Sequence, residues 1–310
     1  SPAGERQNAA MANPLLPLLA CAAVAAVERP NIVLICIDDL KPTIGCFGDA
    51  AARTPNIDRL ARHGVAFTRS YVQQAVCGPS RNSLMTGLRP DQLGVYDLAT
   101  NFRRAAPDVV TLTQAFMRAG WHAEGMGKIY HTGSGDDPAS WSLPHVYTED
   151  ATPKERTGGP GLPPGAKAKV PEPGRARGLP WAWPECADDV TRDGRTAARA
   201  VERLGTLAEK GQPFFLAVGF SKPHLPFIVP KRYWDLHDPA RLPMPDADAK
   251  PPSGAPTWAG NIGFGELRNY TDIQDVGPLT PEQARTMVHG YYASTSFVDA
   301  QVGKVLDELE

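Results

Sequence analysis

The sequence lacks an excess of charge of either sign. Its 310 residues carry 32 Lys and Arg against 34 Asp and Glu, a net charge of −2. This balance leaves no broad basic surface for nucleic acid or an anionic membrane, so a polyanion would have to be bound locally. With 42% hydrophobic and 21% charged residues, the composition excludes a disordered, collagen-like or coiled-coil chain. The length fits one large domain or two ordinary ones.

A hydrophobic run long enough to span a bilayer is missing too. The apolar stretch at residues 14–27, PLLPLLACAAVAAV, falls short of the ~20 residues that a span needs. Its length suits a secretory signal, and the small residues at 23–25 suit a cleavage site. Residues 18–21 also resemble a bacterial lipobox, in which Cys21 would carry a lipid anchor. We therefore expect a leader at residues 1–28 and a secreted or periplasmic protein; an ordinary apolar strand or buried helix is the alternative.

Cysteine is sparse, whereas glycine and proline are abundant. The five cysteines cannot all pair, so at least one is unpaired, removed by processing or chemically special. Cys36 has the surroundings of a small core residue, while Cys46 and Cys186 are predicted in loops and could either pair or stay reduced. The 29 Gly and 31 Pro indicate a loop-rich chain. They cluster in residues 151–180, inside an insertion predicted at about 133–180; a disordered linker is the alternative.

Strand-like and helix-like segments alternate along the chain. Apolar runs predict strands at residues 31–37, 65–72, 121–126 and 214–220. Capping and stop signals predict helices at residues 55–63, 79–86, 111–119, 190–210 and 281–309. This alternation is typical of an α/β fold with a mainly parallel sheet, here one domain over residues 29–310.

Charged side chains and histidines follow three of the predicted strands. They are Asp38 and Asp39, then Lys128 and His131, then Lys222 and His224. Open α/β sheets bind ligands beyond the carboxyl ends of their strands, so we expect these side chains to converge. Carboxylates there favour a hard cation, and Lys with His favours an anionic substrate whose leaving group needs a proton. Singly, each pattern is more often a helix cap or an ordinary surface or core residue.

The segment CGPSR at residues 77–81 opens one of the predicted helices. The positive end of a helix attracts anions and lowers the pKa of a thiol, so a nucleophilic Cys77 is one interpretation. Arg81 is predicted within the first turn, where a cation opposes the helix dipole. That placement indicates a functional arginine; an exposed, solvated side chain is the alternative.

The same segment matches the C-x-P-S-R signature, so the chain resembles a type I sulfatase of the alkaline-phosphatase-like superfamily. Further matches follow in order along the chain: RPNI with the Asp pair, TPNIDRL at 54–60, NSLMTG at 82–87, GKIYH at 127–131 and KPHLPF at 222–227. The last two resemble the iduronate-2-sulfatase branch in particular. The resemblance runs from Arg29 to the last residue and implies a mainly parallel sheet sandwiched by helices.

The resemblance also implies a nucleophile and a metal. In this family the signature cysteine, here Cys77, is converted to Cα-formylglycine by a formylglycine-generating maturation enzyme. Its hydrate attacks a sulfate ester, on a sulfated carbohydrate or a related alcohol. Asp38 and Asp39 would bind Ca²⁺ together with an oxygen of the modified Cys77.

Four further residues take roles from the resemblance. Arg81 would hold the hydrate in place, and Lys128 would bind sulfate oxygens. His131 would accept the proton of the hydrate, and His224 would face the leaving oxygen.

The chain departs from the family pattern at its end. The last predicted helix reaches Glu310, whereas the family continues into a strand with further metal ligands and then a lysine. Ca²⁺ takes 6–8 oxygens, and two Asp with one hydrate oxygen fall short of that number. We therefore expect a C-terminally truncated chain, or a fragment, that binds Ca²⁺ poorly and turns over slowly or not at all.

Three other interpretations stay open. A phosphodiesterase or phosphonate monoester hydrolase would keep the fold and change the substrate. An inactive fragment would be at most an anion- or glycan-binding module, and an unmodified cysteine hydrolase would leave the Asp pair unexplained. Trp141, Trp181 and Trp183 near the Gly/Pro-rich stretch could stack on a sugar ring, although loop packing is the commoner role.

Overall fold

A computed structural model describes residues 29–131, 136–148, 178–245, 253–256 and 265–310. The chain divides into two compact units, residues 1–30 and 31–310, and the fold below is that of the second. The predicted leader, with Cys21, lies outside the described residues. Within the described part, no helix combines the length and the apolar character needed to cross a membrane.

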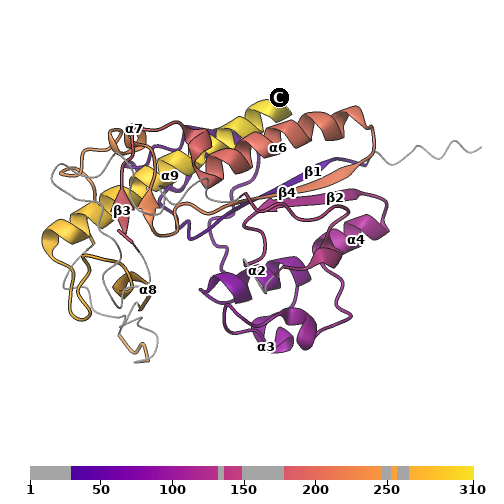
Figure 1. Cartoon of the computed structure of the whole chain (residues 1–310), viewed down its shortest axis with the longest axis horizontal. Coiled ribbons are helices and arrows are strands. Elements are labelled where there is room, and N and C mark those ends of the chain that lie inside the picture. Colours follow the sequence, from indigo (N-terminus) through magenta and orange to yellow (C-terminus); the bar gives the residue numbers. More distant parts are fainter. Residues whose placement is uncertain (1–28, 132–135, 149–177, 246–252, 257–264) are drawn as a thin grey trace, which may run out of the picture. The chain divides into compact units, whose positions relative to one another are not determined.

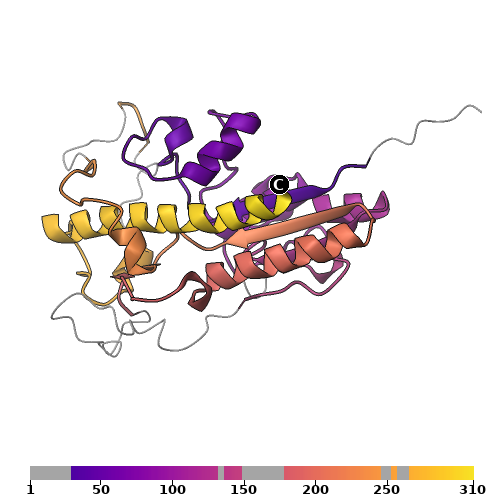
Figure 2. The same ribbon diagram turned by 90° about the horizontal axis from the view of Figure 1, so that it is seen from above.

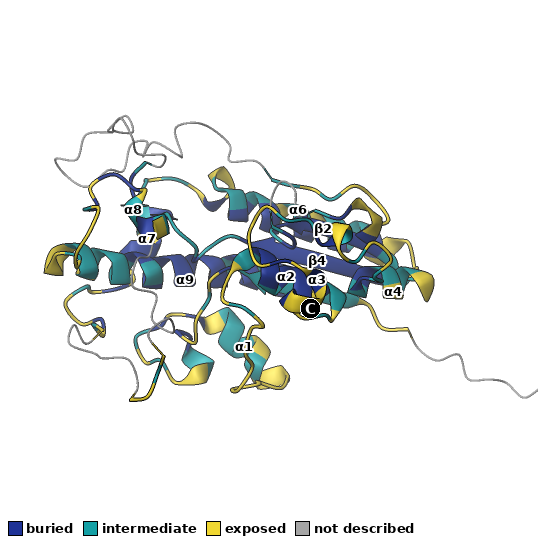
Figure 3. Ribbon diagram, turned by 90° about the horizontal axis from the view of Figure 1, so that it is seen from below, coloured by how far each residue is buried: buried dark blue, intermediate teal, exposed yellow. Residues whose placement is uncertain are grey.

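A three-stranded parallel sheet forms the centre of this unit (Figure 1). The strands are β1 (Ile32–Ile37), β4 (Phe214–Phe220) and β2 (His122–Gly127), in the order β1-β4-β2. The middle strand reads FFLAVGF and is buried along its whole length, because both of its faces and both of its edges are covered (Figure 3). Three of the four predicted strands are thus confirmed.

Helices cover both faces of the sheet, as predicted for an α/β fold. On one face lie α6 (Arg192–Glu209) and α9 (Pro281–Leu309), which run side by side in Figures 1 and 2. On the other face lie α2 (Cys77–Thr86), α3 (Pro90–Leu93) and α4 (Leu112–Arg118). Each layer has its own apolar core: Leu204 and Val302 pack on the first face, and Phe102 and Tyr130 on the second.

Shorter elements surround this sandwich. A second parallel pair consists of β3 (Trp181–Ala182) and β5 (Phe227–Ile228). Among the described residues, the remaining α-helices are α1 (Pro55–His63), α7 (Lys231–Trp234) and α8 (Gly265–Arg268). Short 3₁₀ turns occupy Gly45–Phe47, Phe102–Arg104, Pro138–Ser140 and Asp188–Val190.

The start of α9 follows from its sequence. Thr280 Oγ1 accepts the N–H of Gln283 at 3.1 Å, and Gln283 Oε1 accepts the N–H of Thr280 at 2.9 Å. This reciprocal pair satisfies two of the donors that a helix leaves free at its start. Helix α9 in turn caps α1, because Asp299 Oδ1 accepts the N–H of Ile57 at 2.8 Å. The long helix therefore fixes α1 against the core.

The strand predicted at residues 65–72 does not form. Val65, Phe67 and Tyr71 are 79%, 73% and 85% exposed, and the segment pairs with no strand among the described residues. An apolar alternation is stable as a strand only beside a neighbour that supplies backbone hydrogen bonds. The apolar alternation at residues 65–72 is therefore not sufficient to predict a strand.

Part of the predicted insertion packs on the sheet. Residues 149–177 lie outside the described part, but Val146 forms a parallel bridge with Met126 of β2. Trp141 is only 6% exposed, and its ring meets Tyr130 edge-on at 6.1 Å between centroids. Trp141 is therefore a core residue, and the sugar-stacking interpretation is wrong for it.

His237 predicts a pH-dependent stability. Its ring is buried and pairs with Ser296 Oγ at 2.9 Å; burial, helped by nearby His289 and Arg53, lowers its pKa from 6.5 to about 4. The neutral ring is thus favoured by folding. This preference adds up to about 3 kcal/mol to the free energy of unfolding. The contribution is complete above pH 6.5 and is lost as the pH falls toward 4.

Urea unfolding at about pH 7 and about pH 4.5 measures this loss. The free energy of unfolding should fall less between these values in His237→Asn than in the wild type. His63→Asn, at an exposed position, serves as the control. An equal loss in His237→Asn and the wild type would contradict the assignment.

Candidate active site

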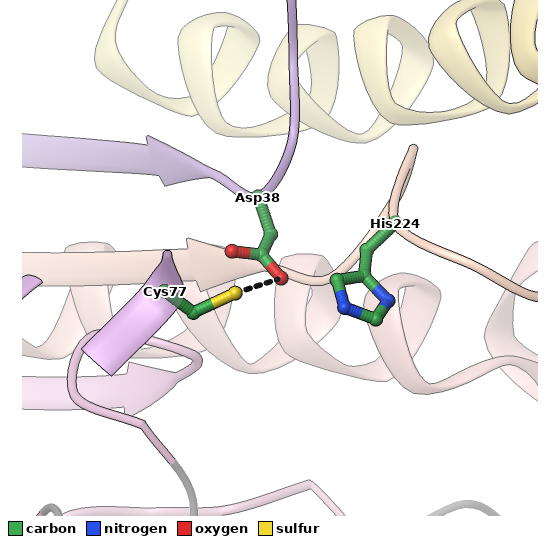
Figure 4. A group of neighbouring side chains, drawn as sticks. All are labelled: Asp38, Cys77 and His224. Atoms are coloured by element: carbon green, nitrogen blue, oxygen red, sulfur yellow. Dashed lines mark hydrogen bonds between the residues drawn. The ribbon is translucent and has the colours of Figure 1, made fainter. Parts of the chain in front are cut away.

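The carboxyl ends of the three central strands bring the predicted residues together. Asp38 directly follows β1, Lys128 directly follows β2, and His224 lies in the loop after β4. Cys77 enters from the start of α2. Asp38, Cys77 and His224 each offer one possible ligand atom within 4.8 Å of the others (Figure 4). Because parallel strands end at one edge of the sheet, residues far apart in sequence meet there.

Asp38 is the buried centre of this site. Arg81 Nη2 lies 2.6 Å from Asp38 Oδ1, and Lys128 Nζ contacts Oδ2. Burial alone would raise the pKa of this carboxyl, but the two cations outweigh it and lower the pKa to about 2. Asp38 is therefore ionised over the whole physiological range.

Arg81 is buried, so its interpretation as a solvated side chain is wrong. It lies one turn inside α2 because this helix begins at Cys77, two residues earlier than predicted. Besides Asp38, its guanidinium reaches the carbonyls of Lys128 and Ile129, the latter at 3.1 Å. Arg81 therefore ties helix α2 to the turn that carries Lys128.

Cys77 stands between an acid and an amine. Its Sγ lies 3.9 Å from Asp38 Oδ2 and 3.8 Å from Lys128 Nζ. Burial, with Asp38, raises the pKa of the thiol more than Lys128 lowers it. The net direction is opposite to the lowered pKa expected at a helix start, so a plain cysteine here would stay protonated near neutral pH. A Cβ on the next residue, Gly78, would lie 2.7 Å from the carbonyl oxygen of Asp97, so only glycine fits there.

Asp39 lies on the exposed side of the site. Its backbone is left-handed, with φ 57°, and its carbonyl accepts the hydroxyl of Tyr291 at 2.7 Å. Its Oδ2 lies 3.8 Å from His224 Nε2. The two carboxylates thus approach the site from different sides, Asp38 from within and Asp39 from the surface.

His224 presents one ring nitrogen to the site. Its Nδ1 donates to the carbonyl of Leu225 at 2.6 Å, which leaves Nε2 directed toward the acids. Nε2 lies 3.7 Å from Glu266 Oε1 of α8. Sequence reasoning missed Glu266, since no local pattern marks it and 42 residues separate it from His224.

A buried carboxylate, also missed, holds the loop of His224. Asp193, in the first turn of α6, accepts the N–H groups of Ser221 at 2.8 Å and Lys222 at 2.7 Å. Lys222 itself donates to the carbonyls of His224 and Pro226, at 3.2 and 2.8 Å. Lys222 therefore stabilises its own loop. An acid two residues after the N-cap is typical of any helix start, so no local pattern predicts this contact of Asp193.

The remaining predicted residues have other surroundings. His131 lies four residues beyond the end of β2, half-buried, and does not belong to the cluster of Asp38, Cys77 and His224 among the described residues. Its role as a proton acceptor stays a prediction. Neither Cys46 nor Cys186 forms a disulfide in the described part of the chain, so these two cysteines do not pair with each other.

The donors present suit a hard cation in part. Carboxylate oxygens are what Ca²⁺ prefers, and Asp38 and Asp39 supply two such groups, one beside Cys77 and one beside His224. In the structure the oxygens of Asp38 are engaged by Arg81 and Lys128. A cation bound to Asp38 would compete with these two side chains.

Solved structures define the class of the fold. The phosphonate monoester hydrolase of Agrobacterium radiobacter superposes with a TM-score of 0.68 at 22% identity, over 91% of this chain and 59% of that one. The architecture is therefore the alkaline-phosphatase-like α/β fold. At this identity the likeness concerns the fold alone.

The sulfatase family model matches residues 30–310, and the chain belongs to this family. It is 34% identical to the human iduronate 2-sulfatase in an alignment of 307 positions, gaps included, that covers 92% of this chain and 52% of that protein. It is 31% identical to a sulfatase of Formosa agariphila over 291 residues, 92% of this chain and 56% of that protein. The chain spans about half the length of the curated relatives it matches.

Proposed function

We propose that the protein is a sulfuric ester hydrolase that removes sulfate from a sulfated carbohydrate. The observation that carries the proposal is Cys77, the first position of the family signature, within 4 Å of both Asp38 and Lys128. Similarity to iduronate 2-sulfatase supports a carbohydrate as the alcohol. A protonated, unmodified thiol would be a poor nucleophile in this place, which supports conversion of Cys77 to formylglycine.

A formylglycine hydrate at Cys77 would supply two hydroxyls on one carbon: one would take the sulfate group as the alcohol leaves, and the other would lose its proton to expel sulfate and restore the aldehyde. The chain's own residues prepare the surroundings. Lys128 Nζ, 3.8 Å from Cys77 Sγ, lies where it can neutralise oxygens of a sulfate group. His224 Nε2, 3.8 Å from Asp39 Oδ2, can carry a proton to the leaving oxygen. Asp38 and Asp39 would hold Ca²⁺, which supplies further positive charge for the sulfate.

Two partners and a location complete the proposal. The partners are a sulfated glycan and a formylglycine-generating enzyme. Action outside the cytoplasm is supported by the leader-like composition of residues 14–27.

The deciding experiment is the mass of the proteolytic peptide that contains Cys77, from protein produced together with a formylglycine-generating enzyme. We expect an aldehyde or its hydrate at Cys77, and turnover of an aryl sulfate well above that of an aryl phosphodiester. An intact thiol, while the same enzyme converts a control peptide, would contradict the proposed nucleophile. Preferential phosphodiester turnover would favour the phosphodiesterase or phosphonate hydrolase alternative.

Asp193→Asn should lower kcat about tenfold or more with little change in KM. Its carboxylate holds the backbone of Ser221 and Lys222, and an amide would turn a donor toward one of these N–H groups. The loop would then carry His224 away from the leaving oxygen, and small misplacements of this kind reduce catalysis strongly.

Steady-state kinetics and thermal unfolding of Asp193→Asn separate positioning from stability. The matched control is Asp189→Asn, an exposed position just before α6. If kcat and KM stay at their wild-type values while only the unfolding temperature falls, Asp193 has a merely structural role.

A further inference from the structure

A second cleft lies against α9, away from the candidate active site. Its volume is about 340 Å³, and His289 of α9 forms part of its lining. Tyr291, two residues later, reaches Asp39 at the candidate active site. Two residues turn a helix by about 200°, so His289 and Tyr291 point to opposite sides of α9, and the cleft is separated from the active site by at least the width of this helix, roughly 10 Å. The cleft is therefore a separate site.

Aromatic rings form the fixed wall of the cleft. Trp183, half-buried just after β3, lies 5.1 Å between ring centroids from Trp234 of α7. Trp234 meets His289 edge-on at 4.8 Å, and His289 Nε2 donates to the carbonyl of Trp234 at 2.8 Å. Each ring is thus held by the next, so little conformational entropy would be lost when a ligand contacts them.

Charged groups of both signs stand at the rim of this wall. Lys231 and Asp235 pair with each other at 2.6 Å, and Arg285 uses one N–H group on the carbonyl of Pro239 at 2.8 Å. Glu282, one turn before Arg285 on α9, is exposed. The charges of the two cations and the two carboxylates cancel, so the rim favours neither an anionic nor a cationic ligand. It offers hydrogen-bond donors and acceptors together.

We infer that this cleft binds an uncharged sugar unit of a glycan. A pyranose ring has a face of C–H groups that can lie on the electron-rich face of an indole, here Trp183. The hydroxyls at its edge are donors and acceptors at once and match the mixed rim. A volume of about 340 Å³ lies at the small end of small-molecule sites, which suits one or two sugar units.

This inference extends the proposed function, on which it rests only for the identity of the natural glycan. Binding in the cleft needs neither the modified Cys77 nor a metal. A polymer held here would keep its sulfated units near the candidate active site, because one helix separates the two places. The cleft would thereby favour polymeric over monomeric substrates through a raised local concentration.

The test is a titration of the unmodified protein with cellobiose, maltose and chitobiose, followed by the indole N–H signals in nuclear magnetic resonance. One of the 6 Trp signals, assigned to Trp183 by its loss in Trp183→Phe, should shift and saturate at millimolar sugar. Trp183→Ala should weaken binding at least about tenfold, and Glu282→Gln about fivefold. Glu209→Gln, with the same charge change at the exposed end of α6, should bind like the wild type.

Three results would overturn the inference. They are no saturable binding of any of the three sugars, unchanged binding in both Trp183→Ala and Glu282→Gln, or displacement of the sugar by inorganic sulfate or tetramethylammonium. The exposed Glu282 keeps the test valid if Trp183→Ala fails to fold. In protein whose Cys77 has been converted to formylglycine, sugar binding without aryl sulfate turnover would contradict the proposed function alone, whereas turnover without sugar binding would contradict this inference alone.

Discussion

A Cys77→Ser variant should react with at most one equivalent of sulfate ester and then stop. A serine hydroxyl would stand at the start of α2, in reach of Lys128, as the cysteine does. It could accept a sulfate group, but it has no second hydroxyl on the same carbon to expel that group. We expect steady-state kcat to fall on the order of 10⁴-fold or more, as when other nucleophiles are removed.

The intact mass of Cys77→Ser after incubation with an aryl sulfate shows whether one sulfate group has been transferred to the protein. The spectrum should show unmodified or singly sulfated protein, with product release no greater than the protein concentration. Cys46→Ser, which alters a free thiol outside this site, should keep wild-type turnover. Turnover of Cys77→Ser within tenfold of the wild type would show that a formylglycine hydrate is not required.

The central sheet and the location of the site could be predicted because both depend on local patterns. Apolar runs of six or seven residues define β1 and β4 with few alternatives. Once the strands are parallel, whatever follows them must gather at one edge. Asp38, Lys128 and His224 were predicted in this way, and the structure brings all three to that edge.

What could not be predicted depends on partners that are distant in sequence. The raised pKa of Cys77 comes from burial and from Asp38, which outweigh the lowering by Lys128 and Arg81. Asp193 looks like an ordinary helix-end acid until the loop at Ser221 folds against it. The apolar alternation at residues 65–72 likewise carries the local signal of a strand but lacks a paired neighbour among the described residues.

Trp141, Trp181 and Trp183 also show that local sequence does not determine the role of a single side chain. Trp141 packs in the core beside Tyr130, and Trp181 of β3 packs against apolar residues of two clusters. Trp183, by contrast, lines the cleft beside α9. All three stand near the same Gly/Pro-rich stretch, so composition could not separate the sugar-binding candidate from the packing residues.

Asp38→Ala should destabilise the metal-free protein by about 3–5 kcal/mol, the usual cost of removing one partner from a buried ion pair. The side chains of Asp38, Arg81 and Lys128 are 4%, 8% and 11% exposed, so water cannot replace the lost carboxylate. In Asp38→Ala, the buried side chains of Arg81 and Lys128 would both lose their shared carboxylate partner. Urea unfolding in the presence of a chelator measures the change. Asp91→Ala, which breaks the exposed pair with Arg89, should cost at most about 1 kcal/mol.

A second substitution tests whether unpaired charge is the cause. Lys128→Met removes one of the two stranded cations while its chain still fills the space, so the double variant Asp38→Ala with Lys128→Met should be more stable than Asp38→Ala alone. In the wild-type background, Lys128→Met should lower the free energy of unfolding, because Asp38 then keeps only Arg81 as its cationic partner. The two substitutions are therefore expected to be non-additive. Additive effects would mean that lost packing dominates and that the carboxylate does not hold the two cations together.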